Sequence, residues 1–78
     1  MNPLQVYTEI FAAAFGLSQK EAAETNLENL AAWDSLAHLA LIAALDDAFG
    51  IHIGVKDMTA LRSFANGLEI LRKYGIAV

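Results

Sequence analysis

The sequence predicts an all-α protein, a small bundle of three main helices plus one short helix, with a long loop after the first main helix. Apolar residues recur at spacings of three and four along three segments of the 78-residue chain, as on one face of a helix. Each segment begins with a residue typical of helix starts and ends near a glycine. Hydrophobic residues make up 56% of the chain, and much of that share is alanine, which favours helices. We therefore expect residues 1–78 to form a single, free-standing domain around one core.

The first helix is predicted to begin at Pro3, because a missing backbone N–H costs little in the first turn of a helix. Gly16 is well placed to end it, since glycine readily adopts the left-handed conformation that follows many helices. The residues that recur at helical spacing between these limits are Leu4, Tyr7, Ile10, Phe11 and Ala14.

A long connection follows, from about residue 17 to residue 33. It contains two capping-box patterns, Ser18 with Glu21 and Thr25 with Glu28, so we expect one or two single-turn helices within it. It has few glycines and several apolar residues, which favours an ordered loop held on the core. The apolar residues that can hold it there are Leu17, Leu27, Leu30 and Trp33.

The second main helix is predicted to begin after Asp34, a good N-cap residue, and to end at Gly50. Spacings of three and four define an apolar face, which we expect to belong to the core. The residues of this predicted face are Leu36, Leu39, Ile42, Leu45 and Phe49.

The segment after Gly50 alternates apolar Ile51 and Ile53 with His52, as a short strand would, but no partner strand is apparent. We therefore predict an apolar loop. Asp57 is predicted to cap the short helix, which continues to about Leu61.

The last helix is predicted to begin after Ser63 and to end at Gly75. Arg72 and Lys73 would lie in its final turn, where positive charge complements the helix dipole. The apolar residues of its inner face are Phe64, Leu68 and Leu71.

The formal charge of −4, from nine acidic and five basic residues, excludes the basic surface that a nucleic-acid-binding protein needs. It also argues against docking on anionic lipids and suits partners that present basic patches. The longest clean apolar run, 39–45, is far shorter than the ~20 residues of a membrane span. No secretion signal is visible, so we expect a cytoplasmic protein without membrane insertion.

The chain contains no cysteine, which excludes disulfides, cysteine metal sites and a cysteine nucleophile. No ligand set joins His38 to His52, so we expect no metal site. The sequence also lacks the Gly-x-Ser-x-Gly motif and an apparent arrangement of histidine and acid, which argues against a serine hydrolase.

Ser35 is the candidate for chemistry. It falls in the first turn of an amphipathic helix directly after a long loop, where its hydroxyl would be exposed. Unpaired backbone N–H groups and the helix dipole favour an anion there by about 0.3–1 kcal/mol, so a phosphodiester on Ser35 would be well placed. Aspartate and serine are also ordinary residues at helix starts, and these residues alone fit simple capping.

The surrounding segment, 33–53, strongly resembles the acyl carrier protein family. It contains Asp-Ser-Leu at 34–36, an acidic pair at Asp46 and Asp47, and Phe-Gly-Ile at 49–51. The order of the helices, the long first loop and the nearly central serine extend the resemblance over almost the whole chain. The apolar positions that match between these motifs are Leu39, Ile42 and Leu45.

The resemblance implies that a phosphopantetheinyl transferase attaches 4′-phosphopantetheine from coenzyme A to Ser35. The terminal thiol of this arm then carries an acyl group as a thioester, and the chain performs no catalysis. It implies a monomer that presents its cargo to acyl-loading, acyl-modifying and acyltransferase enzymes, which would read the second main helix. The residues predicted for partner recognition are Asp34, Leu36, His38, Asp46 and Asp47.

His38 lies one turn after Ser35 and could contact the phosphodiester or a modifying enzyme. The alternative, which we favour from the sequence, is an exposed helix residue without a role. If the acyl chain is sheltered inside the protein, we expect its site near Leu45, Ile53, Met58 and Leu61, next to Ala60.

Ala37 and Ala40 stand where many fatty-acid carriers have further acidic residues. This departure predicts less electrostatic docking and a dedicated pathway, such as polyketide, lipid or glycolipid synthesis. An aminoacyl carrier of nonribosomal peptide assembly and an unmodified helical scaffold are the alternatives. The Trp-Asp-Ser-Leu form at 33–36 favours acyl cargo over the first alternative, and an intact Ser35 argues against the second.

Overall fold

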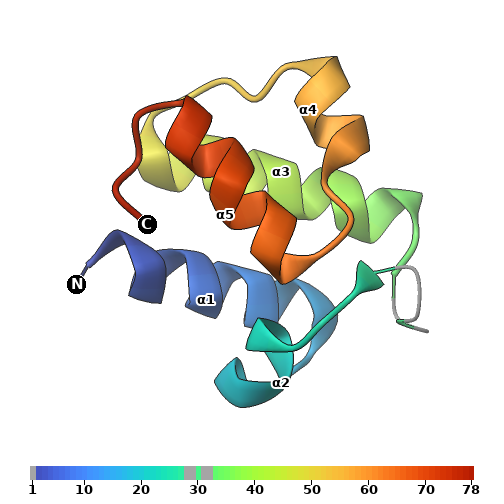
Figure 1. Cartoon of the computed structure of the whole chain (residues 1–78). Coiled ribbons are helices and arrows are strands. Elements are labelled where there is room, and N and C mark those ends of the chain that lie inside the picture. Colours follow the sequence, from blue (N-terminus) through green and yellow to red (C-terminus); the bar gives the residue numbers. More distant parts are fainter. Residues whose placement is uncertain (1, 28–29, 31–32) are drawn as a thin grey trace.

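The computed structural model describes residues 2–27, 30 and 33–78, and these residues form the predicted all-α fold. The described part contains no strand, only an isolated bridge between Asn26 and Ser63. Figure 1 shows α1 and α3 running in opposite directions, with α4 near the start of α3. The helices are α1 (Pro3–Phe15), α2 (Gln19–Ala23), α3 (Ser35–Phe49), α4 (Val55–Ala60) and α5 (Phe64–Lys73).

The first helix has the predicted limits. Pro3 occupies its first turn, and Gly16 follows it in the left-handed conformation with a φ of 67°. Its N-cap is Asn2, which the sequence analysis did not identify: the side-chain oxygen accepts a hydrogen bond from Gln5 N at 2.8 Å.

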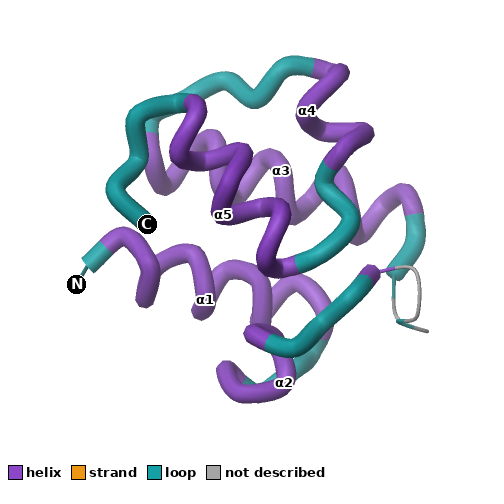
Figure 2. Tube along the Cα trace, in the orientation of Figure 1, coloured by secondary structure: helices purple, strands orange, loops and turns teal. Residues whose placement is uncertain are grey.

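The long connection is folded against the core, as predicted, with Leu27 fully buried and its other three apolar residues partly buried. Ser18 and Glu21 form the expected capping box at the start of α2. The second predicted capping box involves Glu28, which lies outside the described residues. Two backbone hydrogen bonds join the connection to the start of α5 and the residues before it, from Leu27 N to Arg62 O and from Phe64 N to Thr25 O. Figure 2 shows this connection as a continuous teal and purple path below α5, up to the grey residues.

The buried face of α3 differs from the predicted one. Leu36 and Leu39 are 77% and 53% exposed, and the positions that face the core instead include His38 and Leu41. The prediction was confirmed for Ile42 and Leu45 and wrong for Leu36 and Leu39. The error arose because α3 carries leucines on two sides, so that spacings of three and four fit two different faces. The contacts with the rest of the core decide which face is buried. The buried residues of α3 are His38, Leu41, Ile42 and Leu45.

The core is built mainly from aromatic residues of α1 and aliphatic residues of α3 and α5. Tyr7 and Phe11 pack against Phe64, with ring centroids 4.7 and 5.4 Å apart. The Tyr7 hydroxyl donates a hydrogen bond of 2.8 Å to the Phe64 carbonyl, which satisfies this buried polar group.

The start of the short helix also differs from the prediction. Gly54 is the N-cap of α4, and Asp57 lies within the first turn rather than before it. Its carboxylate turns instead to α5 and the residue after it, accepting hydrogen bonds from Lys73 Nζ at 2.6 Å and from the Tyr74 hydroxyl at 2.8 Å. No residue of α4 is buried, so polar contacts are important in holding this helix in place.

The end of the chain follows the predictions closely. Ser63 caps α5, and Asn66 completes a capping box that the sequence analysis had not identified. Arg72 and Lys73 lie in the last turn, and Gly75 follows with a φ of 84°. Among the described residues, no helix combines the length and apolar character required to span a membrane.

Candidate functional site

Ser35 is the first residue of α3, and its side chain is exposed beside a pocket. The preceding residue, Asp34, provides the N-cap: its Oδ1 accepts a hydrogen bond of 2.7 Å from Ala37 N. The first N–H groups of a helix lack acceptors within the helix, so they favour an anion attached at this end. The sequence therefore placed both residues correctly.

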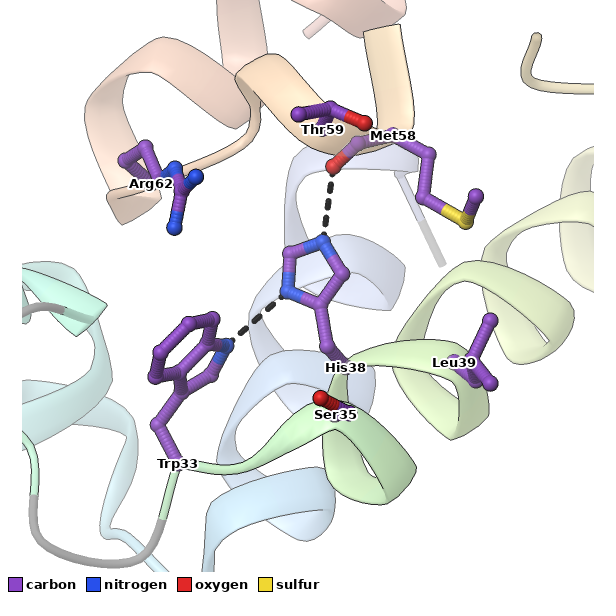
Figure 3. A pocket seen from close by; sticks show the side chains of 7 residues that line it. All are labelled: Trp33, Ser35, His38, Leu39, Met58, Thr59 and Arg62. Carbon is purple, nitrogen blue, oxygen red and sulfur yellow. Dashed lines mark hydrogen bonds between the residues drawn. The ribbon is translucent and has the colours of Figure 1, made fainter. Parts of the chain in front are cut away.

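The pocket has a volume of about 300 Å³ and lies where the end of the long connection, the start of α3 and α4 meet. Figure 3 shows Trp33 and Arg62 on one side of the His38 ring, Met58 and Thr59 beyond its far end and Ser35 near its base. The pocket combines apolar walls with a few polar groups, as small-molecule sites commonly do. Its lining residues are Trp33, Ser35, His38, Leu39, Met58, Thr59 and Arg62.

His38 is only 9% exposed, so the expectation that it would be an exposed helix residue was wrong. Trp33 Nε1 lies 3.0 Å from His38 Nδ1, and His38 Nε2 lies 2.7 Å from the Met58 carbonyl. An indole N–H can only donate, so Nδ1 must accept, which places the ring proton on Nε2 for donation to Met58. His38 thus connects the loop before Ser35 to α4.

This hydrogen-bonding pattern does not support Ser35 as a catalytic nucleophile. A general base must have a free acceptor within reach of the hydroxyl proton. In His38, Nδ1 accepts from Trp33 and Nε2 carries the proton that is donated to Met58. Neither nitrogen of the neutral ring remains available to accept the Ser35 proton.

Arg62 is a residue of this pocket that the sequence analysis missed. Its guanidinium carbon lies 5.6 Å from the centroid of the Trp33 ring, within the range of a cation–π contact. The His38 ring packs edge-on against the same indole, with the centroids 5.8 Å apart. No local sequence pattern predicts that Arg62 belongs to this pocket, because it lies 29 positions after Trp33 in the chain.

Of the residues predicted for partner recognition, three are exposed and two are engaged within the protein. Leu36 and Asp47 are exposed on α3 and available to a partner. Asp34 is also exposed but caps the helix. Asp46 is occupied within the protein, because its Oδ1 accepts a hydrogen bond of 2.9 Å from Ile53 N, and His38 is buried.

Of the four positions suggested for a sheltered acyl chain, one lines the pocket. Met58 lines it, whereas Leu45, Ile53 and Leu61 are buried in the core. Shelter of a cargo stays a prediction, and the pocket that Ser35 lines also extends to Trp33 and Arg62.

Comparison with known protein families gives a match to the family model described as a phosphopantetheine attachment site, over residues 8–66. The matched region extends from within α1 into the first turn of α5 and includes the whole pocket. Searches of curated proteins and of solved structures found no match.

Proposed function

The chain belongs to the phosphopantetheine attachment site family, whose members carry a covalent 4′-phosphopantetheine group, and we propose that Ser35 is the residue that holds it here. The group supplies a terminal thiol on which a carboxylic acid is held as a thioester. The residues present fit such a group, because an exposed hydroxyl lies at a helix N-terminus beside a pocket.

The observation that carries this assignment is a difference among the three serines of the chain. The Oγ atoms of Ser18 and Ser63 accept hydrogen bonds of 3.1 Å from Glu21 N and Asn66 N, so both hydroxyls are used as helix caps. Ser35 begins α3 one residue after the cap, and Asp34 performs the capping in its place. This division of roles leaves the Ser35 hydroxyl available for modification.

Acyl cargo and a dedicated biosynthetic pathway are the second part of the proposal. The exposed side of α3 carries Leu36, Leu39 and Asp47, together with small alanines. Such a surface suits partner enzymes that dock through apolar contacts with limited charge pairing. These partners would be a phosphopantetheinyl transferase and the enzymes that load, modify and transfer the acyl group.

The attachment is tested by intact mass after incubation with coenzyme A and a broad-specificity phosphopantetheinyl transferase. We expect the wild type to gain one phosphopantetheine and Ser35→Ala to gain none. Ser18→Ala is the matched control, because it removes a hydroxyl of another helix start and should still be loaded. A folded wild type without a mass gain, or a gain that persists in Ser35→Ala, would contradict the assignment.

The pathway is tested separately in a reconstituted fatty-acid synthase. We expect the loaded protein to replace the general carrier poorly, because Ala37 and Ala40 do not provide the acidic surface that such enzymes read. Efficient replacement would rule out the dedicated role while leaving attachment at Ser35 intact.

A further inference from the structure

Among the described residues that line the pocket with Ser35, Arg62 is the only lysine or arginine. Two other cations near the end of the chain have partners of their own: Lys73 Nζ donates to Asp57, and Arg72 Nε donates to the Val78 carbonyl. Within residues 2–27, 30 and 33–78, no carboxylate lies within salt-bridge distance of the Arg62 guanidinium. Its charge is therefore available to a ligand in the pocket.

The position of Arg62 is fixed by bonds that do not use its charge. Its carbonyl accepts a hydrogen bond of 2.8 Å from Leu27 N, and its own N–H donates to Asn66 Oδ1 at 3.0 Å. The guanidinium lies over the Trp33 ring. A guanidinium on an aromatic face keeps its in-plane N–H groups directed outward, where they can bind two oxygens of a phosphate.

A cation in this pocket would stabilise the modified form of Ser35. A phosphodiester on Ser35 adds a negative charge directly after Asp34, in a chain whose formal charge is already −4. Thr59 is a poor alternative donor, because its hydroxyl donates to the Val55 carbonyl at 2.9 Å. Arg62 is the remaining cationic donor among the lining residues.

We propose that the Arg62 guanidinium binds the phosphodiester at the root of the arm and holds it against the pocket between α3 and α4. This inference rests on the proposed attachment to Ser35. It assigns to Arg62 a positioning role: the start of the arm is held beside Trp33, while the rest of it remains free to reach a partner enzyme.

The test compares apo and loaded forms of the wild type, Arg62→Gln and Arg72→Gln. Arg72→Gln removes a charge of equal size outside the pocket and is the matched control. In the wild type, loading should shift the Arg62 Nε–H resonance. The phosphorus resonance of the loaded arm should differ from its wild-type position in Arg62→Gln and keep that position in Arg72→Gln. Loading should also change the emission of Trp33, the single tryptophan of the chain.

Thermal unfolding gives a second measurement. For each protein we compare the unfolding midpoint of the loaded form with that of the apo form. At low salt, loading should raise the midpoint of the wild type by roughly 1–5 °C more than it raises that of Arg62→Gln. This difference should shrink at 1 M salt, where the screening length falls to about 3 Å. Both arginine bonds that fix the backbone are retained in Arg62→Gln, so the variant should fold.

The outcomes separate the two proposals. A wild type that gains no phosphopantetheine on Ser35 overturns both. A wild type that is loaded but shows the same Arg62 Nε–H resonance in both forms, with the same phosphorus resonance in Arg62→Gln, overturns the role of Arg62 alone.

Discussion

Two glycines of this protein each face a tyrosine hydroxyl, and the space around them differs sharply. A Cβ atom added to Gly67 of α5 would collide with the Tyr7 hydroxyl and lie 3.1 Å from Tyr7 Cζ. A Cβ atom added to Gly54, the N-cap of α4, would lie 3.8 Å from the Tyr74 hydroxyl, an ordinary contact distance. The junction of α1 with α5 therefore has no spare volume, whereas the junction of α4 with the end of α5 has some.

The difference shows how the two junctions are stabilised. Tyr7 is fully buried among aromatic rings, so close apolar packing holds α1 and α5 together. No residue of α4 is fully buried. Met58 packs against the edge of the core, and polar bonds join this helix to His38, Lys73 and Tyr74. Because α4 forms one wall of the pocket beside Ser35 (Figures 1 and 3), we expect that wall to adjust to a ligand more readily than the packed junction of α1 with α5.

The largest effect is expected from Gly67→Ala. Replacing an exposed helical glycine by alanine would stabilise a helix by up to about 1 kcal/mol. Here the collision with buried Tyr7 adds an overpacking cost of about 1–3 kcal/mol and weakens the bond to the Phe64 carbonyl. We expect a net loss of about 2 kcal/mol in the free energy of unfolding, measured by urea denaturation.

Gly54→Ala is the matched control, because it adds the same atom beside the other tyrosine, and it should cost less than about 1 kcal/mol. In a Tyr7→Phe background the cost of Gly67→Ala should fall, since the colliding oxygen is absent. Equal costs for the two glycine substitutions would show that the junctions do not differ in packing.

The next effect is a loss of stability at alkaline pH. Burial raises the pKa of the Tyr7 phenol above its ordinary value, because the charged form would lose its hydration. Above pH 10, the ordinary pKa of tyrosine, the unfolded chain therefore loses this proton while the folded protein keeps it. The contribution of Tyr7 is fully present below pH 10 and decreases by up to about 1.4 kcal/mol per pH unit above it.

Urea unfolding at pH 9, 10 and 11 measures this dependence, with Tyr7→Phe as the reference. The variant lacks the ionisable group at the same position, so its stability should decline less steeply in this range. Parallel declines in both proteins would place the alkaline sensitivity elsewhere in the molecule.

A smaller effect is expected from His38→Leu. The leucine fits an apolar site but leaves Trp33 Nε1 and the Met58 carbonyl without their partner. Because the pocket is open to water, we expect a loss of only about 1 kcal/mol rather than the full cost of two buried unpaired groups. The emission of Trp33 should change together with the stability, since the indole loses its acceptor.

His38→Gln offers a side chain that can accept from Trp33 and donate to Met58, and it should recover part of both signals. If His38→Leu leaves the Trp33 emission unchanged, the indole does not depend on this hydrogen bond.

Most of the features that the sequence predicted correctly are set by neighbouring residues. A cap joins a side chain to a backbone group three positions away, so Asp34 with Ala37, Ser18 with Glu21 and the stop at Gly16 can be read locally. The placement of Ser35 follows from the same local information. The proposed attachment site is therefore the part of the function that can be predicted most directly from the sequence.

Apart from the local caps at Asn2, Gly54 and Asn66, the features that the sequence did not reveal depend on contacts between distant segments. His38 meets Met58 twenty positions later, and Gly67 meets Tyr7 across the core. Arg62 reaches the pocket through the pairing of its backbone with Leu27. For α3 the pattern was ambiguous, because leucines occupy two faces and only the packing against α1 and the rest of the core selects one.

The smallest effect, and the most local, is expected from Asp57→Asn. The hydrogen bond from Lys73, followed by that from Tyr74, lowers the pKa of the Asp57 carboxyl. A carboxyl with a lowered pKa stabilises the fold above its unfolded pKa, about 3.9, and loses that contribution as the pH falls through its folded value. The difference in stability between the wild type and Asp57→Asn should thus be present at pH 7 and disappear in strong acid.

Amide hydrogen exchange shows which part of the fold the Asp57 carboxylate stabilises. The Gly54 N–H donates to the Tyr74 hydroxyl, which in turn donates to Asp57, so Asp57→Asn should speed exchange at Gly54. Glu21→Gln is the control, because its carboxyl also has a lowered pKa but serves the capping box of α2. If exchange instead quickened equally at Gly54 and throughout α1 and α5, α4 would open only with the whole fold, and its junction would be no more adjustable than the packed one.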